Sequence, residues 1–224
     1  KGNIYGRMLH RKADLSLEPD LATKWEKLDA NTWRFSLRRG VKFHNGNDFN
    51  ADDVLFSYKR QTQEASDMSF ALATIKQINK VDDYTVDLIT KGPDPILLLN
   101  MPMFYIVDKE WIEANNAFEV VRASGSTNFA NVNTNGTGPF KVVEWIQDTR
   151  IVLEPFEGYW GKNHIRTLKS LNALKGIVEP DKNTLKSVLK EYPIAKGHSN
   201  IQEALLQDYD AFTIATPAKT HFEI

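Results

Sequence analysis

The six residues Glu157-Gly158-Tyr159-Trp160-Gly161-Lys162 (EGYWGK) mark the point at which the sequence pattern of the 224-residue chain changes. Before them, short alternating strands, tight turns and isolated helices are typical of an α+β module with an antiparallel sheet. After them, helices and strands alternate in the order of a parallel βαβ sheet. The sequence therefore predicts an α/β protein of two parts, residues 1–156 and residues 157–224.

Composition predicts a globular protein and excludes several classes of function. Hydrophobic residues make up 42% of the chain and charged residues 25%, which is enough apolar material for a core. A formal net charge of -1 gives no basis for a nucleic-acid partner. The chain has no cysteine, so it has no disulfide and no thiolate metal site. No apolar run approaches the ~20 residues that a membrane span needs, and none is expected.

Four aromatic side chains of the first part are candidates either for a ligand groove or for the core. Two of them alternate with polar residues in the strand Thr32 to Arg38, and the others stand in similar extended stretches. They are Trp33, Phe35, Phe43 and Trp145. Aromatic residues at strand spacing are most often core residues, so we expect all four to be buried.

Paired carboxylates follow a helix cap in the first part. Asn50 is predicted to cap a helix whose first turn holds Asp52 and Asp53. The pair could serve acid-base chemistry, but its place beside a cap favours a role in starting the helix. His10 and His44 have no partners at ligand spacing, so no metal site is predicted, and no catalytic residue is assigned.

Three further elements are predicted in the first part. The strands Ile75–Lys80 and Tyr84–Ile89 flank the turn Asp82-Asp83 and predict an antiparallel pair. Asp108 is predicted to cap a short helix. The polar stretch Ser124–Asn135 is predicted to be a long surface loop.

Three motifs of the first part resemble a known family. They are LEPDLATKWEKLDANTWRFSLRRGVKFHNGNDFNADDVLFSYKR, NGTGPFKVVEW and IVLEPFEGYWGK, in this order, and the resemblance covers about residues 1–161. The sequence resembles the extracellular solute-binding proteins of the dipeptide, oligopeptide and nickel family, which deliver ligand to ABC importers. The resemblance implies a periplasmic-binding-protein type fold whose lobes close on a solute, a peptide or other small solute as ligand, the membrane subunit of an importer as partner, and a periplasmic or extracellular location. Members are much longer, so tight binding of free peptides by this chain is not expected.

The second part alternates helical and extended stretches. Helices are expected at Asn163–Leu171, around Leu185–Leu189 and at Ser199–Leu206, and extended stretches at Gly176–Asp181, Pro193–Ala195 and Ala211–Ala215.

Glycines and an acid in the second part follow the order of a dinucleotide-binding unit. After the strand Arg150–Glu154, Gly158 and Gly161 stand at the second and third glycine positions, and Glu179 follows Gly161 by 18 residues. In such a unit glycines admit a pyrophosphate to a helix N-terminus, and the acid binds the ribose. Phe156 replaces the first glycine, which places a Cβ and a ring where the turn is tightest.

The motifs GYWGKNHIRTLKSL, GIVEPDKNTLKSVLKEYP and DAFTIATPAKTHFEI resemble the N-terminal, NAD-binding part of the Gfo/Idh/MocA oxidoreductases over residues 158–224. The resemblance implies contacts with the pyrophosphate, the adenosine ribose and the nicotinamide half of NAD(P). The residues concerned are Gly158, Tyr159, Trp160 and Gly161, then Glu179, then Thr216, Pro217 and His221. That family's catalytic Glu-Lys-Pro motif is not among these residues, so no enzyme activity is expected, and NAD(P) is expected to bind weakly or not at all.

Three functions remain open at this point. The first is the substrate-binding component, as a fragment, of an ABC importer for peptides or related solutes. The second is a truncated NAD(P)-dependent sugar oxidoreductase, which would imply a cytoplasmic location. The third is a folded chimera, joined at the shared motif Gly-Tyr-Trp-Gly-Lys, that retains no ligand.

Overall fold

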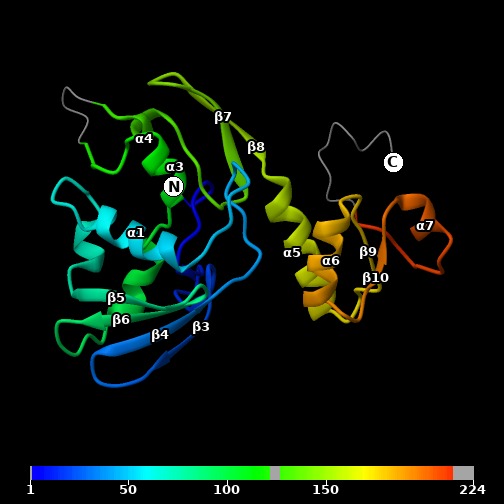
Figure 1. The fold of residues 1–224 in the computed structure, drawn as a ribbon, viewed down its shortest axis with the longest axis horizontal. Helices are drawn as coiled ribbons and strands as arrows, with labels where there is room; N and C mark the ends of the chain where they lie inside the picture. Colours follow the sequence, from blue (N-terminus) through cyan, green and yellow to red (C-terminus); the bar gives the residue numbers. More distant parts are fainter. Residues whose placement is uncertain (1, 122–126, 214–224) are drawn as a thin grey trace. The chain divides into compact units, whose positions relative to one another are not determined.

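The computed structural model describes residues 2–121 and 127–213 of the chain. Contacts divide the chain into two compact units, Lys1–Phe156 (unit 1) and Glu157–Ile224 (unit 2). Among the described residues, the sheets of unit 1 are antiparallel and the sheet of unit 2 is parallel (Figure 1).

The largest sheet of unit 1 has four antiparallel strands in the order β3-β4-β6-β5. Its strands are β3 (Ala22–Lys27), β4 (Thr32–Leu37), β5 (Ile75–Asp82) and β6 (Thr85–Thr90). Helix α1 (Ala51–Gln61) lies against one face of this sheet (Figure 1). The predicted strand at residues 32–38 and the predicted strand pair around Asp82-Asp83 are both present.

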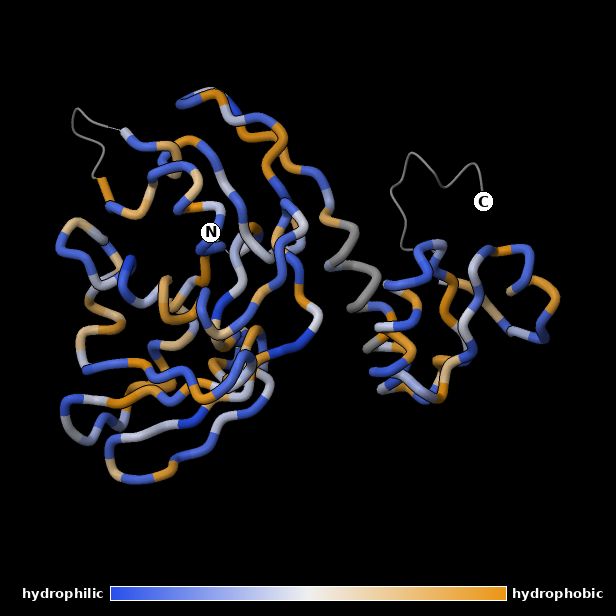
Figure 2. The backbone as a smooth tube through the Cα atoms, in the orientation of Figure 1, coloured by the Kyte–Doolittle hydropathy of each residue, from blue (hydrophilic) through white to orange (hydrophobic). Residues whose placement is uncertain are grey.

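Alternation along β4 and β6 points one row of apolar side chains into the core of unit 1. Phe35 lies opposite Val86, and Trp33 lies opposite Leu88. Phe35, Val86 and Leu88 are fully buried, as is Phe43 in the segment after β4, and Trp33 packs against them partly buried. The predicted core positions of Trp33, Phe35 and Phe43 are confirmed. Figure 2 shows hydrophobic segments gathered between α1 and the sheet.

Helix α1 begins with the predicted cap. The side chain of Asn50 accepts a hydrogen bond from the Asp52 amide, and the Asp53 side chain accepts one from the Asn50 amide, which makes a capping box. Asp52 also forms a 2.9 Å ion pair with Lys80 of β5. Both carboxylates therefore serve the start of the helix, as predicted.

Short elements complete unit 1 before residue 135. They are β1 (Leu9–Arg11), β2 (Leu17–Pro19), η1 (Ser69–Leu72), α2 (Leu97–Asn100), η2 (Met101–Met103), α3 (Lys109–Ala114) and α4 (Phe129–Val132). Strands β1 and β2 pair antiparallel in a ribbon of their own. Asp108 caps α3 by accepting a hydrogen bond from the Trp111 amide, as predicted.

The predicted surface loop Ser124–Asn135 is correct only in part among its described residues. Residues 127–134 are exposed or half-buried, as predicted, but helix α4 forms within them and Asn135 is buried. The reason is a polar cluster inside unit 1: Asn135 donates a 2.8 Å hydrogen bond to Asp108 Oδ2 and accepts one from the Asn45 amide. Buried polar groups that satisfy one another can replace apolar packing, and hydropathy does not reveal them. Residues 124–126 lie outside the described residues.

Strands β7 (Phe140–Ile146) and β8 (Arg150–Pro155) form an antiparallel hairpin at the end of unit 1. The predicted burial of Trp145 is wrong, because 43% of this residue is exposed. Trp145 lies opposite Ile151, which is exposed as well. Strand spacing predicts which side chains share a face, but it does not predict that another layer covers that face.

Unit 2 consists of α5 (Glu157–Ser170), β9 (Gly176–Val178), α6 (Lys182–Glu191), β10 (Lys196–His198) and α7 (Ile201–Leu205). Strands β9 and β10 pair parallel, with α6 as the crossover between them. Ile177 of β9 and Leu174 belong to a small apolar core against which Leu185 and Leu189 of α6 pack. This is the βαβ arrangement that the sequence predicted.

Three expectations for unit 2 differ from the structure. Helix α5 begins at Glu157, so Gly158 and Gly161 lie inside its first turns and not in a turn before it. Strand β8, expected to open the βαβ unit, pairs with β7. The expected extended stretch Pro193–Ala195 is a turn, and the strand follows it as β10. Residues 211–213 are not strand, and Ile214 and Ala215 lie outside the described residues.

Candidate functional site

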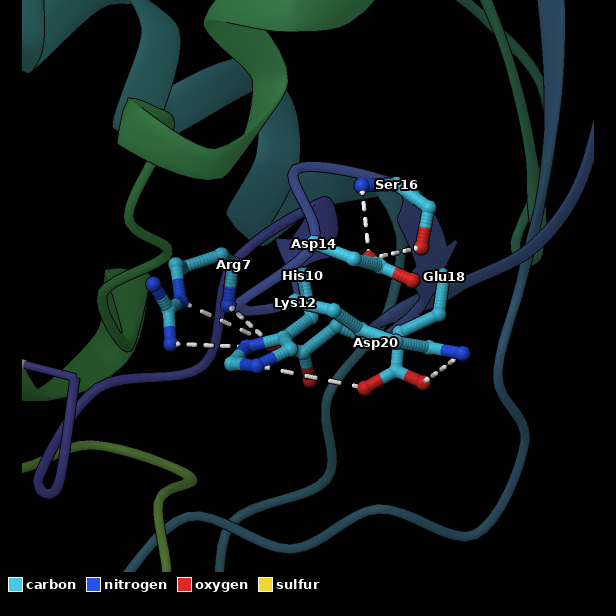
Figure 3. A network of polar contacts seen from close by, with 7 residues as sticks. All are labelled: Arg7, His10, Lys12, Asp14, Ser16, Glu18 and Asp20. Carbon is cyan, nitrogen blue, oxygen red and sulfur yellow. Dashed lines mark hydrogen bonds and ion pairs between the residues drawn. The ribbon is translucent and has the colours of Figure 1, made fainter.

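Charged and polar side chains gather around the ribbon of β1 and β2 (Figure 3). We call this group the Arg7 cluster. It comprises Arg7, His10, Lys12, Asp14, Ser16, Glu18 and Asp20. The ribbon positions them because His10 lies opposite Glu18 in its register, while Arg7 and Asp20 stand just beyond the same end of the ribbon, where Leu9 pairs with Pro19.

Arg7 is the central member of the cluster. Its Nη2 donates a 3.0 Å hydrogen bond to His10 Nδ1, which must accept because a guanidinium has no acceptor. Its Nε is buried and has no hydrogen-bond partner among the described residues. The nearest carboxylate oxygen, Asp20 Oδ2, is 3.9 Å from Nε, too far for a hydrogen bond. Arg7 therefore keeps a buried donor that no side chain satisfies.

Asp20 stands beside the guanidinium and is held by the backbone. Its Oδ2 accepts a 3.2 Å hydrogen bond from the Arg7 amide, and its carbonyl accepts one from Arg38 Nε at 2.8 Å. Burial raises the pKa of the Asp20 carboxyl, although the hydrogen bond from Arg7 and the charges of Arg7 and Arg38 oppose that rise. The cluster thus places a cation and a carboxylate side by side where water is partly excluded.

A glycine lies next to the guanidinium of Arg7. A Cβ built on Gly2 would lie 3.0 Å from Arg7 Nη2, so a side chain at position 2 would close on the guanidinium. Glycine at this position therefore avoids a close contact with the guanidinium.

The segment that carries Arg7 is held by a loop far along the chain. The Gly6 amide donates to Thr137 Oγ1 at 3.1 Å, and the Gly138 amide donates to the Ile4 carbonyl at 2.8 Å. A Cβ on Gly138 would approach the Ile4 carbonyl carbon to 2.6 Å, so only glycine permits this approach. The backbone around Arg7 is therefore fixed on both sides.

The chemistry of the cluster suits a charged solute. A guanidinium with a spare donor binds carboxylate or other anionic groups by charge-assisted hydrogen bonds, and the neighbouring Asp20 can accept from an ammonium. The other contacts of the cluster are exposed to solvent and contribute little to stability. Lys12 forms an ion pair with Glu18 at 3.7 Å, and Asp14 accepts a 2.6 Å hydrogen bond from Ser16 Oγ. We take Arg7 and Asp20 as the functional pair.

The residues predicted to bind a dinucleotide are only partly brought together. Gly158, Tyr159, Trp160 and Gly161 all lie in the first turns of α5. Glu179 follows β9, where its Oε1 accepts a 2.9 Å hydrogen bond from the Asp181 amide at the start of α6. Thr216, Pro217 and His221 lie outside the described residues.

Residues 2–121 and 127–213 contain neither a metal-binding cluster nor a membrane-spanning helix. No group of three or more His, Asp or Glu side chains there is arranged to hold a metal ion. None of the helices described is long and apolar enough to pass through a bilayer.

Sequence reasoning missed the Arg7 cluster. Neither Arg7 nor Asp20 stands in a motif of charged residues. Their environment depends on Thr137, which is 131 positions from Gly6, so no local pattern could have identified them. The glycines of the stretch Gly136-Thr137-Gly138 were the one available signal of a close backbone approach.

Comparison with known proteins supports the resemblance of residues 1–161 to solute-binding proteins. A family model described as bacterial extracellular solute-binding proteins, family 5 Middle, matches residues 16–188. The dipeptide-binding protein of Escherichia coli is 33% identical over 189 residues, which cover 74% of this chain and 34% of that protein. Heme-binding protein A of Haemophilus influenzae is 31% identical, over 70% of this chain and 32% of its own length.

A solved structure of a similar protein has the same fold over part of its length. NikZ from Campylobacter jejuni, in complex with Ni(L-His), aligns with a TM-score of 0.63 at 25% identity, over 71% of this chain and 31% of that one. The chain spans about a third of the length of these relatives. The matched family consists of solute-binding proteins, which agrees with the expectation that the chain is not an enzyme. On these matches, the chain belongs to the bacterial extracellular solute-binding proteins of family 5.

Proposed function

We propose that the chain is part of the substrate-binding component of an ABC importer that takes up peptides or related small solutes outside the cytoplasm. The observation that carries the proposal is the family match, which covers the four-stranded sheet, α1 and the β7–β8 hairpin of unit 1. The named ligands of the relatives include a dipeptide, heme and Ni(L-His), so the solute class is wider than peptides. The importer's membrane subunit is the partner in this proposal.

Within that function, Arg7 is the group that meets the negative charge of the solute. The support is the buried Nε, which has no hydrogen-bond partner among the described residues. Asp20, 3.9 Å from Arg7 Nε, is placed to meet a positive charge on the same solute. A pair of this kind suits a zwitterion such as a peptide better than a neutral solute.

A hybrid protein tests the proposed function. Unit 1 replaces the aligned residues of the E. coli dipeptide-binding protein, and the hybrid is produced in a strain that lacks its own copy. We expect the hybrid to be exported and to restore dipeptide uptake. A second hybrid, built with the aligned residues of heme-binding protein A, controls for the exchange itself. If the control restores uptake while an exported and folded unit 1 hybrid does not, the proposed function is wrong.

A second candidate function is nucleotide binding by unit 2. Its support is the parallel β9-α6-β10 arrangement, with Glu179 directly after β9. In dinucleotide-binding units an acid at this place binds a ribose. We further propose that residues 157–224 derive from an oxidoreductase of the Gfo/Idh/MocA kind, which would make the chain a chimera. The unit boundary at Phe156 and Glu157 supports the proposal, whereas the solute-binding family match runs on to residue 188.

Sequencing of single uninterrupted DNA molecules across codons 150–170 tests the chimera. The proposal requires one continuous reading frame through Phe156 and Glu157. Molecules that continue after this point with solute-binding sequence alone would contradict it.

A further inference from the structure

His44 binds the loop of residues 136–138 through its backbone and both nitrogens of its ring. Its amide donates to the Gly136 carbonyl at 2.9 Å, and the Gly136 amide donates back to His44 Nδ1 at 3.3 Å. The other ring nitrogen, Nε2, bonds the Gly138 carbonyl at 3.0 Å. One residue therefore holds a loop that begins 92 positions further along the chain.

These partners determine the protonation state of the imidazole. A backbone amide can only donate, so Nδ1 must be the accepting nitrogen and carries no proton. A carbonyl can only accept, so Nε2 must carry the proton. His44 is thus neutral in this arrangement. A second proton, on Nδ1, would set two donors against each other and break the hydrogen bond from Gly136.

The same loop supports the backbone next to Arg7. The amide of Gly6, the residue before Arg7, donates to Thr137 Oγ1 at 3.1 Å. A Cβ on Gly136 would collide with the Ile4 carbonyl, so the loop and the N-terminal segment lie in direct backbone contact. A displacement of the loop would therefore remove the support of the segment that carries Arg7.

The surroundings of His44 favour its neutral form. Burial lowers the pKa of the imidazole below its ordinary value of 6.5, the bond to the Gly138 carbonyl opposes this fall, and the charge of Lys141 adds to it. Lys141 is itself paired with Glu154 at 2.8 Å. The hold on the loop is thus complete above pH 6.5 and is lost as pH falls through the lower pKa of the folded state.

Other titratable groups near His44 are engaged elsewhere. Asp108 Oδ2 accepts three side-chain amide donors, and Asp48 pairs with Lys42 at 2.7 Å. Burial raises the pKa of Tyr5, which packs against Gly136, to about 12, so this phenol stays neutral. Within residues 2–121 and 127–213, no carboxylate forms an ion pair with the His44 ring that would stabilise its charged form.

We propose that His44 is a positioning residue for Arg7, which in its neutral form holds the loop of residues 136–138 and on protonation releases this loop together with the backbone of Gly6. The hold of His44 on the loop needs no ligand, and only its effect on a bound solute rests on the proposed function. A solute at Arg7 would then bind more weakly in acid than at neutral pH.

Amide hydrogen exchange of the 224-residue chain between about pH 7.5 and about pH 4 measures the release. The protection factors of the Gly6 and Gly138 amides should fall about tenfold, the scale of one lost hydrogen bond, and with a midpoint below 6.5. The Leu37 amide, which donates to the Tyr84 carbonyl in the sheet, should keep its protection. Protection that is independent of pH, or that falls equally at Leu37, would overturn the proposal.

Two variants at position 44 separate protonation from packing. In His44→Gln the side chain can still donate to the Gly138 carbonyl but cannot titrate, so the fall in Gly6 protection should disappear. In His44→Phe a ring remains beside Phe156 without either ring hydrogen bond. Its Gly6 protection at neutral pH should already be as low as that of the wild type in acid. A fall that persists in His44→Gln would overturn the proposal even where His44→Phe does not fold.

The second histidine near Arg7 provides the matched control. His10 Nδ1 accepts from Arg7 Nη2, so a change in its protonation also alters the surroundings of Arg7. His10→Gln should retain the fall in protection at Gly6, because the loop is bound by His44. Loss of the fall in His10→Gln would assign the effect to the wrong histidine and overturn the proposal.

A dipeptide titration separates this proposal from the proposed function. Between about pH 7.5 and about pH 4 the wild type should lose about tenfold more affinity than His44→Gln, which shares every other titrating group. An equal loss in both proteins would overturn the link between the loop and Arg7. If the Gly6 amide responds to pH as expected but no dipeptide binds at either pH, the release is supported and the proposed function is contradicted.

Discussion

Asp53 Oδ1 accepts a 3.0 Å hydrogen bond from the amide of Lys109, which joins the start of α1 to the start of α3. The other oxygen of the same carboxyl closes the capping box with the Asn50 amide. Asp53 is buried, and this burial raises its pKa to about 6 despite the two hydrogen bonds. The nearby charges of Asp108 and Glu110 add to the rise.

The raised pKa of Asp53 predicts a specific dependence of stability on pH. The folded state holds the proton up to about pH 6, whereas the unfolded chain releases it near 3.8, so the contribution of Asp53 is full below 3.8 and is lost as pH rises through 6. In Asp53→Asn this contribution is absent. The difference in unfolding free energy, wild type minus variant, should therefore increase by roughly 2 kcal/mol between pH 7 and pH 4. Urea unfolding followed by tryptophan fluorescence measures it, since Trp25, Trp33, Trp111 and Trp145 all lie in unit 1. A difference that stays constant with pH would show that Asp53 has an ordinary pKa.

Asp108 should be among the most costly polar residues to remove. Its Oδ2 accepts hydrogen bonds from the side chains of Asn45, Asn47 and Asn135, and its Oδ1 caps α3. Asp108→Ala leaves these donors without an acceptor and should lower the unfolding free energy by roughly 3 kcal/mol. The matched control is Asp48→Ala, because the Asp48 side chain forms an exposed ion pair with Lys42, and its loss should cost less than about 1 kcal/mol. Similar costs for the two variants would contradict the buried cluster.

Two aromatic residues at strand spacing should differ sharply in their effect on stability. Phe35 is fully buried, so Phe35→Ala should cost about 3 to 5 kcal/mol of unfolding free energy. Trp145 is 43% exposed, and Trp145→Ala should cost less than about 1.5 kcal/mol. Denaturant unfolding monitored by far-ultraviolet circular dichroism compares the two without relying on tryptophan. Equal costs would mean that another layer covers the β7–β8 hairpin in solution.

Nucleotide binding by unit 2 should be weak or absent. Titration of the unmodified chain with NADH, followed by fluorescence, should give no micromolar affinity. Whatever binding exists should weaken by about fivefold in Glu179→Ala, which is the scale of one polar contact of ~1 kcal/mol. Phe156→Gly removes the ring directly before α5 and should strengthen this binding. The same change removes the edge-on contact between the Phe156 and His44 rings, whose centroids are 4.8 Å apart, and should destabilise unit 1. Micromolar affinity in the unmodified chain, or no change in Glu179→Ala, would remove the assigned roles of Phe156 and Glu179.

Local sequence patterns predicted the helices and strands that are determined by residues close together in the sequence. The alternation around Phe35 predicted β4, the cap at Asn50 predicted α1, and helix-strand alternation predicted the parallel pair β9 and β10. The predictions were wrong where residues distant in the sequence determine whether a side chain is buried. Asn135 is buried because Asp108 binds it, and Trp145 is exposed because no second layer covers its face among the described residues.

The candidate site was not predictable for the same reason. The exposed or buried state of Arg7 Nε depends on the fold of β1 and β2, and the position of Gly6 depends on Thr137. The sequence pattern instead pointed to the glycines of EGYWGK, because glycines in a turn before a helix are typical of a phosphate-binding loop. In the structure these glycines lie inside α5.

The most direct test of the account is whether a small zwitterionic solute meets unit 1 at Arg7. The chain, labelled with ¹⁵N, is titrated with a dipeptide that has a free carboxylate and with the same dipeptide amidated at its C-terminus. We predict weak binding of the free dipeptide, with a Kd of about 1 mM or higher because few walls enclose it, seen as shifts of the Gly6, Arg7 and Thr137 amides. These shifts should be lost in Arg7→Gln and with the amidated dipeptide. Equal shifts with both dipeptides, shifts that persist in Arg7→Gln, or no shift at these residues would contradict the account.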